Sequence, residues 1–269
     1  MREAPLTDSS GGVQERELAY YESLYGGFGV GHFAKPAVVA FREYLVARIL
    51  CRTKARSDSR VLSIGCGIGD TELLLAPQVG HVTGIDLSPT AIREANGAAK
   101  TKGVKNARFL EASWPAPALD GESFDVVLAI FFLHHLPDPA LDAFPAQLLP
   151  LLTDGGQFYA LEPSARRLSG FLGKLLVPGL MKKYQTEDER QLLPGRTAAP
   201  FLEAGFAAAT SWFDFCSTPL AGLFPSWAAG YRLARRLDQA LTACPGVRAF
   251  SSNFELMAYR PRMAESIST

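Results

Sequence analysis

Three glycines at alternate positions form the clearest chemical feature of the sequence. They lie in the segment VLSIGCGIGD, residues 61–70, where a buried strand is expected to turn into a helix. Because glycine lacks a Cβ, the backbone there can approach a ligand closely, and a helix amino terminus offers unpaired N–H groups to anionic or carboxylate parts of a ligand. The pattern is typical of a nucleoside-cofactor site. A tight turn between strand and helix can also use glycines for packing alone, and that alternative stays open from the motif by itself.

An acidic residue supports the cofactor interpretation. Asp86 ends the second predicted strand, seventeen positions after Gly69, where a carboxylate can accept both hydroxyls of a ribose. Ser88 is the better N-cap for the helix that starts at Pro89, so we expect the Asp86 carboxylate to be free for a ligand. Together the two signals favour an adenosine-type cofactor at the carboxyl ends of the strands.

Two adjacent histidines could carry acid–base chemistry. His134 and His135 follow the fourth predicted strand, at the end of the sheet where a pocket would lie. The alternative is that they pack and cap the loop. With His32 and His81 the chain has four histidines but no carboxylate cluster of ligand spacing, so we predict no metal site.

Short apolar strands alternate with helices from Arg60 onward, which predicts a doubly wound, Rossmann-like α/β fold. We expect a seven-stranded mixed sheet with an antiparallel final strand. The predicted strands are Arg60–Ile64, Val82–Asp86, Ala107–Leu110, Phe124–Ile130, Gln157–Leu161, Ala208–Phe215 and Asn253–Arg260.

Helices and domain organisation follow from caps, breakers and apolar spacing. Residues 1–52 are expected to form a tail and a helical arm or lid, with helices from Glu17 to Leu24 and from Pro36 to Arg52 separated by the glycine-rich residues 26–31. Residues 53–269 form the core, with Ser88 and Asp138 as predicted N-caps. Helical insertions are expected at about 164–195 and 218–249, the second with one helix from about Pro225 to Ala243.

Composition excludes several classes of protein. Among 269 residues, 27 Lys and Arg balance 27 Asp and Glu, so the chain has no overall charge to attract nucleic acid. The amino-terminal residues are polar and acidic, unlike a signal peptide, and no apolar run approaches the roughly 20 residues of a membrane-spanning helix. The four cysteines are scattered without a CxxC pair, so we expect reduced thiols in a cytoplasmic protein.

The sequence resembles the class I S-adenosylmethionine (SAM) dependent methyltransferases, especially the small-molecule branch that includes the ubiquinone and menaquinone biosynthesis enzymes. Four segments carry the resemblance in order: VLSIGCGIGD, GIDLSPTAI, SFDVVLAIFFLHHL and GGQFYALEP. They cover residues 60–163 well and the final strand pair more loosely. The spacing GxGxG rather than GxGxxG also separates the chain from nicotinamide-dependent oxidoreductases, which we keep as a minor alternative.

The resemblance implies SAM as cofactor and S-adenosylhomocysteine as its product. Gly65, Cys66 and Gly67 would face the methionine part, Gly69 would close the turn, and Asp86 would bind the ribose. The remaining implied cofactor contacts are Leu87, Ser113, Trp114, Ala129 and Ile130. Two positions depart from the family pattern: relatives often have an acidic residue where Ser63 stands, and an aspartate where Ser113 stands. With Ser63, support for the SAM amino group would come from backbone carbonyls, those of Gly65 or Ala129, or from water.

The same resemblance implies catalytic residues. A histidine just before the last leucine of the third motif, SFDVVLAIFFLHHL, sometimes works with a tyrosine of the amino-terminal helix. Here that would pair His135, beside His134, with Tyr21 or its neighbours Tyr20 and Tyr25. We therefore expect methyl transfer to a small, apolar acceptor, with oxygen favoured over nitrogen or carbon. The alternative is an inactive methyltransferase-like module that binds SAM or its product and regulates or scaffolds a partner.

Two apolar stripes outside the family core could select the acceptor. One spans Leu168 to Met181. The other contains Leu220, Leu223, Phe224, Trp227, Tyr231, Ala234, Leu237 and Leu241, opposite Arg232, Arg235, Arg236 and Asp238. Packing on the core as a lid is one interpretation, and lining an acceptor pocket is the other. Peripheral contact with a membrane surface and a homodimer are open as further partners; nucleic acid is not expected.

Overall fold

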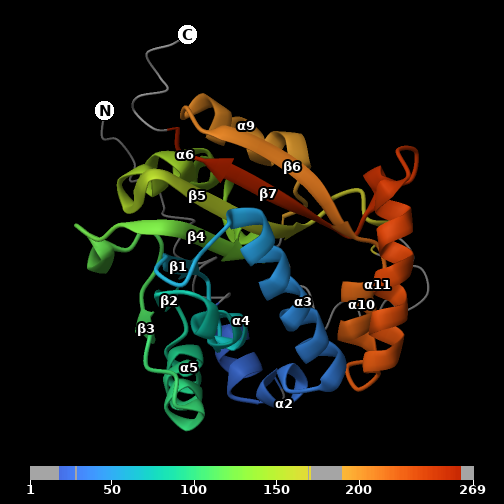
Figure 1. The fold of residues 1–269 in the computed structure, drawn as a ribbon, viewed down its shortest axis with the longest axis horizontal. Helices are drawn as coiled ribbons and strands as arrows, with labels where there is room; N and C mark the ends of the chain where they lie inside the picture. The colour runs from blue at the N-terminus through green and yellow to red at the C-terminus, as the bar shows by residue number, and fades with distance from the viewer. Residues whose placement is uncertain (1–17, 28, 169, 171–189, 262–269) are drawn as a thin grey trace, which may run out of the picture.

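The centre of the molecule is a twisted sheet with strand order β3-β2-β1-β4-β5-β7-β6 (Figure 1). The computed structural model describes residues 18–27, 29–168, 170 and 190–261. Strands β1 to β5 are parallel, and β7 is antiparallel to both β5 and β6. The strands are β1 Arg60–Ile64, β2 His81–Asp86, β3 Ala107–Glu111, β4 Phe124–Ile130, β5 Leu152–Pro163, β6 Ala207–Asp214 and β7 Asn253–Tyr259. The predicted seven-stranded mixed sheet is confirmed.

Alternation along the central strands builds a core on each side of the sheet, because successive side chains point to opposite faces. In β4, Val126 and Leu128 pack against α3, whereas Val127 and Ala129 pack on the other face against α6 and α9. The helices are α2 Gly29–Phe33, α3 Pro36–Thr53, α4 Asp70–Leu75, α5 Pro89–Lys102, α6 Asp138–Leu148, α9 Pro194–Glu203, α10 Ser217–Leu223 and α11 Ala228–Ala243. A further helix covers residues 18–25.

Several predicted helix boundaries and helix numbers are wrong. The glycine-rich segment does not simply break the arm, because α2 forms within it. Asp138 is the first residue of α6 rather than its N-cap; Pro137 takes the cap position, and the Asp138 carboxylate pairs with Arg190. The second insertion holds two helices, α10 and α11, instead of one. Most of the first apolar stripe lies outside the described residues.

No helix in the described part of the chain is long and apolar enough to cross a membrane. Likewise, no group of three or more His, Cys, Asp or Glu side chains suited to a metal ion occurs among the described residues.

Candidate functional site

The glycine turn after β1 requires glycine at each of its three positions. Gly65, Gly67 and Gly69 have φ angles of 69°, 53° and 71°, in the left-handed region that side chains disfavour. Space is restricted as well, because a Cβ on Gly65 would lie 2.7 Å from the Phe132 ring and one on Gly67 would lie 2.7 Å from the Tyr25 hydroxyl. The turn is therefore a narrow cradle with aromatic side chains across from it.

Asp86 braces this turn from the end of β2. Its Oδ2 accepts the Gly67 N–H at 2.8 Å and its Oδ1 accepts the Ser88 N–H at 2.9 Å. The expectation of a free carboxylate is thus wrong, since both oxygens already have a backbone donor; each keeps a further lone pair. Burial raises the pKa of Asp86, while the two backbone hydrogen bonds and nearby His135 favour its charged form. Ser88 caps α5 as predicted, with its Oγ accepting the Ala91 N–H.

A buried carboxylic acid lies beneath the turn, and sequence reasoning missed it. Glu72 Oε1 accepts a hydrogen bond from Ser63 Oγ at 2.6 Å, and only 2% of Glu72 is exposed. Its other oxygen, Oε2, is buried without a hydrogen-bond partner. Burial is the main cause that raises the pKa of Glu72 to about 7. Helix α4 thus places a carboxyl group next to Ser63, the position where the resemblance implies an acidic residue.

The predicted histidine and tyrosine do meet. Tyr21, on the helix over residues 18–25, has its hydroxyl 3.0 Å from His135 Nε2. Their rings pack edge to face with centroids 5.7 Å apart. Tyr25 stacks on Tyr21 at 5.7 Å and covers Gly67, so the arm brings an acid–base pair to the cradle.

His134 has a different environment from its neighbour. Its Nδ1 lies 2.7 Å from Oε2 of Glu162, a fully buried residue at the end of β5. The other oxygen of Glu162 accepts the N–H groups of Phe132 and Leu133 at 2.9 and 2.7 Å. This carboxylate fixes the loop after β4, which begins with Phe131 at a φ of 54°. We therefore interpret His134 as a residue that positions His135.

A carboxylate of the arm fixes its place on the domain. Glu22 accepts hydrogen bonds from the Ser88 and Thr90 hydroxyls and from the Thr90 N–H at 3.0 Å, at the start of α5. The two hydroxyl hydrogen bonds are the largest causes that lower the pKa of Glu22. The sequence gives no signal for this contact, because Glu22 reads as an ordinary helix-surface residue.

The other residues that the resemblance implies as cofactor contacts differ in burial. Leu87 is half-buried and Ser113 is exposed, whereas Ala129 and Ile130 are buried in β4. Trp114 packs on Phe144 with ring centroids 5.1 Å apart, and its indole N–H is buried without a hydrogen-bond partner. Burial raises the pKa of the Cys66 thiol well above its usual value, so the thiol stays protonated and only its backbone can serve the cradle.

Comparisons with known proteins agree with this geometry. Residues 61–156 match a family described as a methyltransferase domain. A demethylmenaquinone methyltransferase of Geobacillus kaustophilus is 27% identical over 191 residues, 63% of this chain and 81% of the relative. A ubiquinone biosynthesis O-methyltransferase of Xylella fastidiosa is 31% identical over 153 residues, 55% of this chain and 61% of the relative.

Other similarities are shorter or more distant. The uncharacterized methyltransferase YcgJ of Bacillus subtilis is 33% identical over 85 residues, which are 32% of this chain and only 34% of that protein. The structure of magnesium protoporphyrin IX methyltransferase from Synechocystis with bound S-adenosylhomocysteine superposes with a TM-score of 0.62, at 17% identity, over 92% of this chain and 99% of that one. The glycine cradle, the acidic residue at the end of β2 and the matched domain lead to one assignment: residues 61–156 form a methyltransferase domain, and the chain is similar to SAM-dependent methyltransferases over a larger part of its length.

Proposed function

We propose that this protein transfers the methyl group of SAM to an oxygen of a small, apolar acceptor, with His135 as the base. The observation that carries the proposal is the Tyr21–His135 hydrogen bond beside the glycine cradle. A relative with 31% identity is named an O-methyltransferase, which supports oxygen as the methylated atom.

The residues of the site fit SAM on two counts. The three glycines of the turn carry no Cβ, as close backbone approach by a ligand requires. The unpartnered Oε2 of Glu72 supplies a buried acceptor that an ammonium group would satisfy. When bound, SAM supplies an already activated methyl group. The N–H groups of the turn would face its methionine part, and the remaining lone pairs of Asp86 would accept the ribose hydroxyls.

The chain's own residues then have defined tasks. His135 Nε2 accepts the proton of the acceptor hydroxyl as the oxygen becomes a nucleophile. Tyr21 holds the imidazole in place and donates to the ring nitrogen until the acceptor arrives. Tyr25 and Phe132 exclude water from the cradle, and Glu162 and His134 keep the loop that bears His135 in position.

Steady-state turnover of His135→Ala tests the proposal. Formation of S-adenosylhomocysteine is measured with a panel of apolar phenols, and SAM affinity is measured by calorimetry. We expect kcat to fall by about 10²–10⁴ with nearly unchanged SAM affinity, because the base acts only on the acceptor. His81→Ala is the matched control, since His81 opens β2 at the amino end of the strands.

Two outcomes would contradict the proposal. Unchanged turnover of His135→Ala at saturating acceptor would remove the histidine from catalysis. Tight binding of SAM and its product by the parent protein, with no turnover of any acceptor offered, would favour the regulatory or scaffold module instead.

A further inference from the structure

The outer side of α10, α11 and the short helix Arg248–Phe250 exposes an unusual set of side chains. Ten large hydrophobic residues in the described part of the chain are exposed, and seven belong to residues 217–250. We call these seven the outer face: Leu223, Phe224, Trp227, Leu233, Leu237, Val247 and Phe250. Four of them are more than half exposed, namely Phe224 at 57%, Trp227 at 54%, Leu233 at 66% and Leu237 at 54%. Clustered exposed hydrophobic residues of this kind mark interaction sites.

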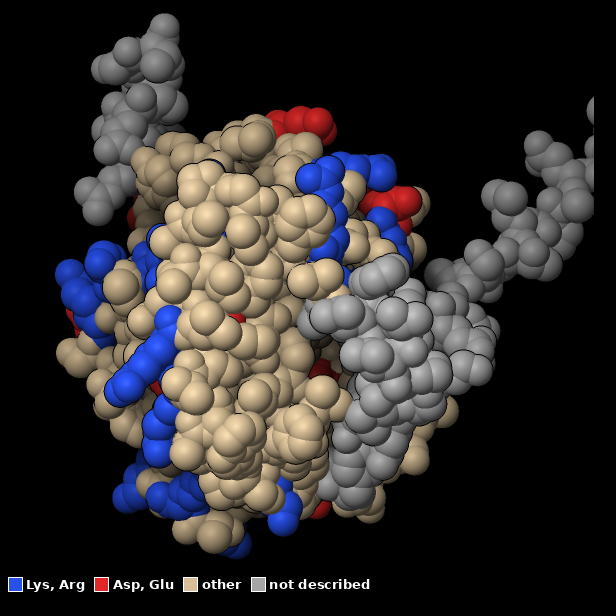
Figure 2. Space-filling model, turned by 90° about the vertical axis from the view of Figure 1, so that its right-hand side faces the viewer, with Lys and Arg blue, Asp and Glu red and all other residues tan. Residues whose placement is uncertain are grey.

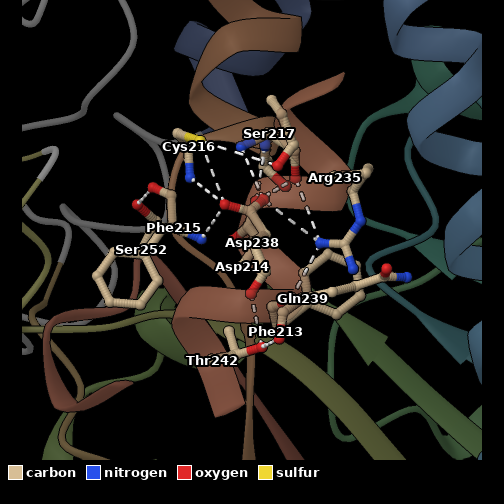
Figure 3. Close-up of polar contacts among 12 residues, drawn as sticks. Phe213, Asp214, Phe215, Cys216, Ser217, Arg235, Asp238, Gln239, Thr242 and Ser252 are labelled. Carbon is tan, nitrogen blue, oxygen red and sulfur yellow. Dashed lines mark hydrogen bonds and ion pairs between the residues drawn. The ribbon is translucent and has the colours of Figure 1, made fainter. Parts of the chain in front are cut away.

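A buried polar network fixes the rotation of α11 and hence which side faces outward (Figure 3). Asp238 is fully buried and accepts the N–H groups of Phe215, Cys216 and Ser217 at 3.1, 2.9 and 3.0 Å. Arg235 donates to the Phe213 carbonyl at 3.1 Å and pairs with Asp238 at 3.5 Å. These contacts tie α11 to β6 and to the start of α10.

A second buried carboxylate completes the anchor. Asp214, at the end of β6, accepts from the Thr218 N–H at 2.6 Å and from Asn253 Nδ2 at 2.7 Å. The residues of α11 that face inward are Tyr231, Ala234, Arg235 and Asp238. The sequence-based expectation that Arg235 and Asp238 lie on a polar outer side is therefore wrong. Because the helix buries Arg235 and Asp238 in hydrogen bonds and an ion pair with neighbouring elements, the exposure of Leu233 and Leu237 follows from the fold.

The exposed charged side chains within residues 217–250 are all arginines. Asp238 is the single acidic residue between positions 217 and 250, and it is buried, whereas Arg232, Arg236 and Arg248 are exposed. Figure 2 shows this side of the molecule with a broad tan surface, Lys and Arg along its lower and left edges, and few Asp or Glu. Aromatic and aliphatic side chains flanked by arginines are typical of protein surfaces that lie in the interface of an anionic membrane.

The same charges disfavour a second copy of the chain as the occupant. A two-fold symmetric contact through this face would bring the arginines of both copies into one interface, and residues 217–250 offer no exposed carboxylate to neutralise them. The face is also connected to the amino-terminal arm, because the Pro225 carbonyl accepts the Ala37 N–H at 2.7 Å at the start of α3.

We propose that the outer face docks this protein onto an anionic lipid bilayer. Phe224, Trp227, Leu233 and Leu237 enter the interfacial layer, and the three arginines contact lipid phosphates. The protein lies on the surface without crossing it. This inference goes beyond the proposed reaction and does not depend on it.

Vesicle sedimentation of the full chain tests the proposal without any acceptor. The probes are vesicles of phosphatidylcholine alone and vesicles with about one third phosphatidylglycerol. We expect binding to the anionic vesicles, weak binding to phosphatidylcholine, and loss of binding as salt rises from about 0.1 to 1 M. Each arginine near the surface contributes roughly fivefold in affinity, so Arg232→Glu/Arg236→Glu should reduce binding by about 25-fold or more.

Matched variants separate the outer face from the rest of the surface. Leu233→Ser/Leu237→Ser should abolish sedimentation, whereas Leu202→Ser, equally exposed on α9, should not. Lys102→Glu/Lys105→Glu, at the end of α5, is the control for charge. All substituted residues are exposed, so circular dichroism should show an unchanged fold.

Three results would overturn the proposal. The first is no sedimentation of the parent protein with anionic vesicles. The second is equal loss of binding in the Leu202 control and the outer-face variant. The third is a stable dimer in light scattering, with no vesicle binding, that Leu233→Ser/Leu237→Ser converts to a monomer.

Discussion

Glu72→Gln should remove a pH dependence of stability that a single buried carboxyl imposes. Glu72 is almost fully buried, one of its oxygens has no hydrogen-bond partner, and the nearby Arg42 pairs with Asp70 at 2.9 Å instead. Its pKa rises from 4.5 to about 7, so the folded protein holds a proton that the unfolded chain releases in this interval. The free energy of unfolding therefore falls as pH rises from about 4.5 to 7, by roughly 3 kcal/mol in total.

Urea unfolding of both proteins between about pH 5 and 8.5 measures this effect. Because glutamine does not titrate, the stability of the variant relative to the parent should increase with pH by about 3 kcal/mol across the interval. Glu94→Gln, an exposed carboxylate on α5, is the control and should leave the pH dependence intact. Parallel stability curves for the parent and Glu72→Gln would refute the reasoning, because they would mean that Glu72 titrates normally in the folded state.

Three further substitutions probe the arm and the core. Tyr21→Phe should lower kcat by roughly tenfold, because it removes one neutral hydrogen bond to His135. An unchanged kcat would mean that Tyr21 has no role in catalysis. Glu22→Gln should weaken the contact of the amino-terminal arm with the start of α5, so limited proteolysis at residues 26–27 should become faster. Because the folded protein lowers the pKa of Glu22, the parent protein should show the same faster proteolysis only as pH falls below about 4.5. Glu255→Gln should lower the free energy of unfolding, measured with urea, by about 3–5 kcal/mol. The reason is that a buried carboxylate, which binds Arg48 through both oxygens at 2.7 Å, loses its charge. A decrease below about 1 kcal/mol would contradict this prediction.

The fold was predictable because its signals are local. The central strands are short apolar runs, and the turn after β1 needs glycines because its backbone takes positive φ angles. Ser88 and Pro89 mark the start of α5 correctly because a cap is a contact between neighbours in sequence. The Tyr21–His135 pair was reached through the family resemblance rather than from spacing, since 114 positions separate the two residues.

What the sequence missed depends on contacts between distant segments. Glu72 looks like an acidic residue in the first turn of a helix, and its burial against Ser63 appears only when α4 packs on the sheet. Helix α10 contains Pro219 and Gly222, which lower its helical propensity, and its start is stabilised by Asp238 from α11. Arg235 and Asp238 look like a solvated polar side, and only the fold shows that they are buried together.

The most direct test of the central claim is calorimetric titration of the purified protein, freed of retained ligand, with SAM, S-adenosylhomocysteine and NADH, with Asp86→Ala beside the parent. Asp86 holds the Gly67 N–H and lies where the ribose hydroxyls would bind, so its loss should weaken binding by tenfold or more, about 1.4 kcal/mol or greater. We predict binding of the two sulfur nucleosides, no binding of NADH, and this weakening in Asp86→Ala. Failure of the parent to bind either sulfur nucleoside, or equal affinity in Asp86→Ala, would contradict the account of the cradle as a SAM site.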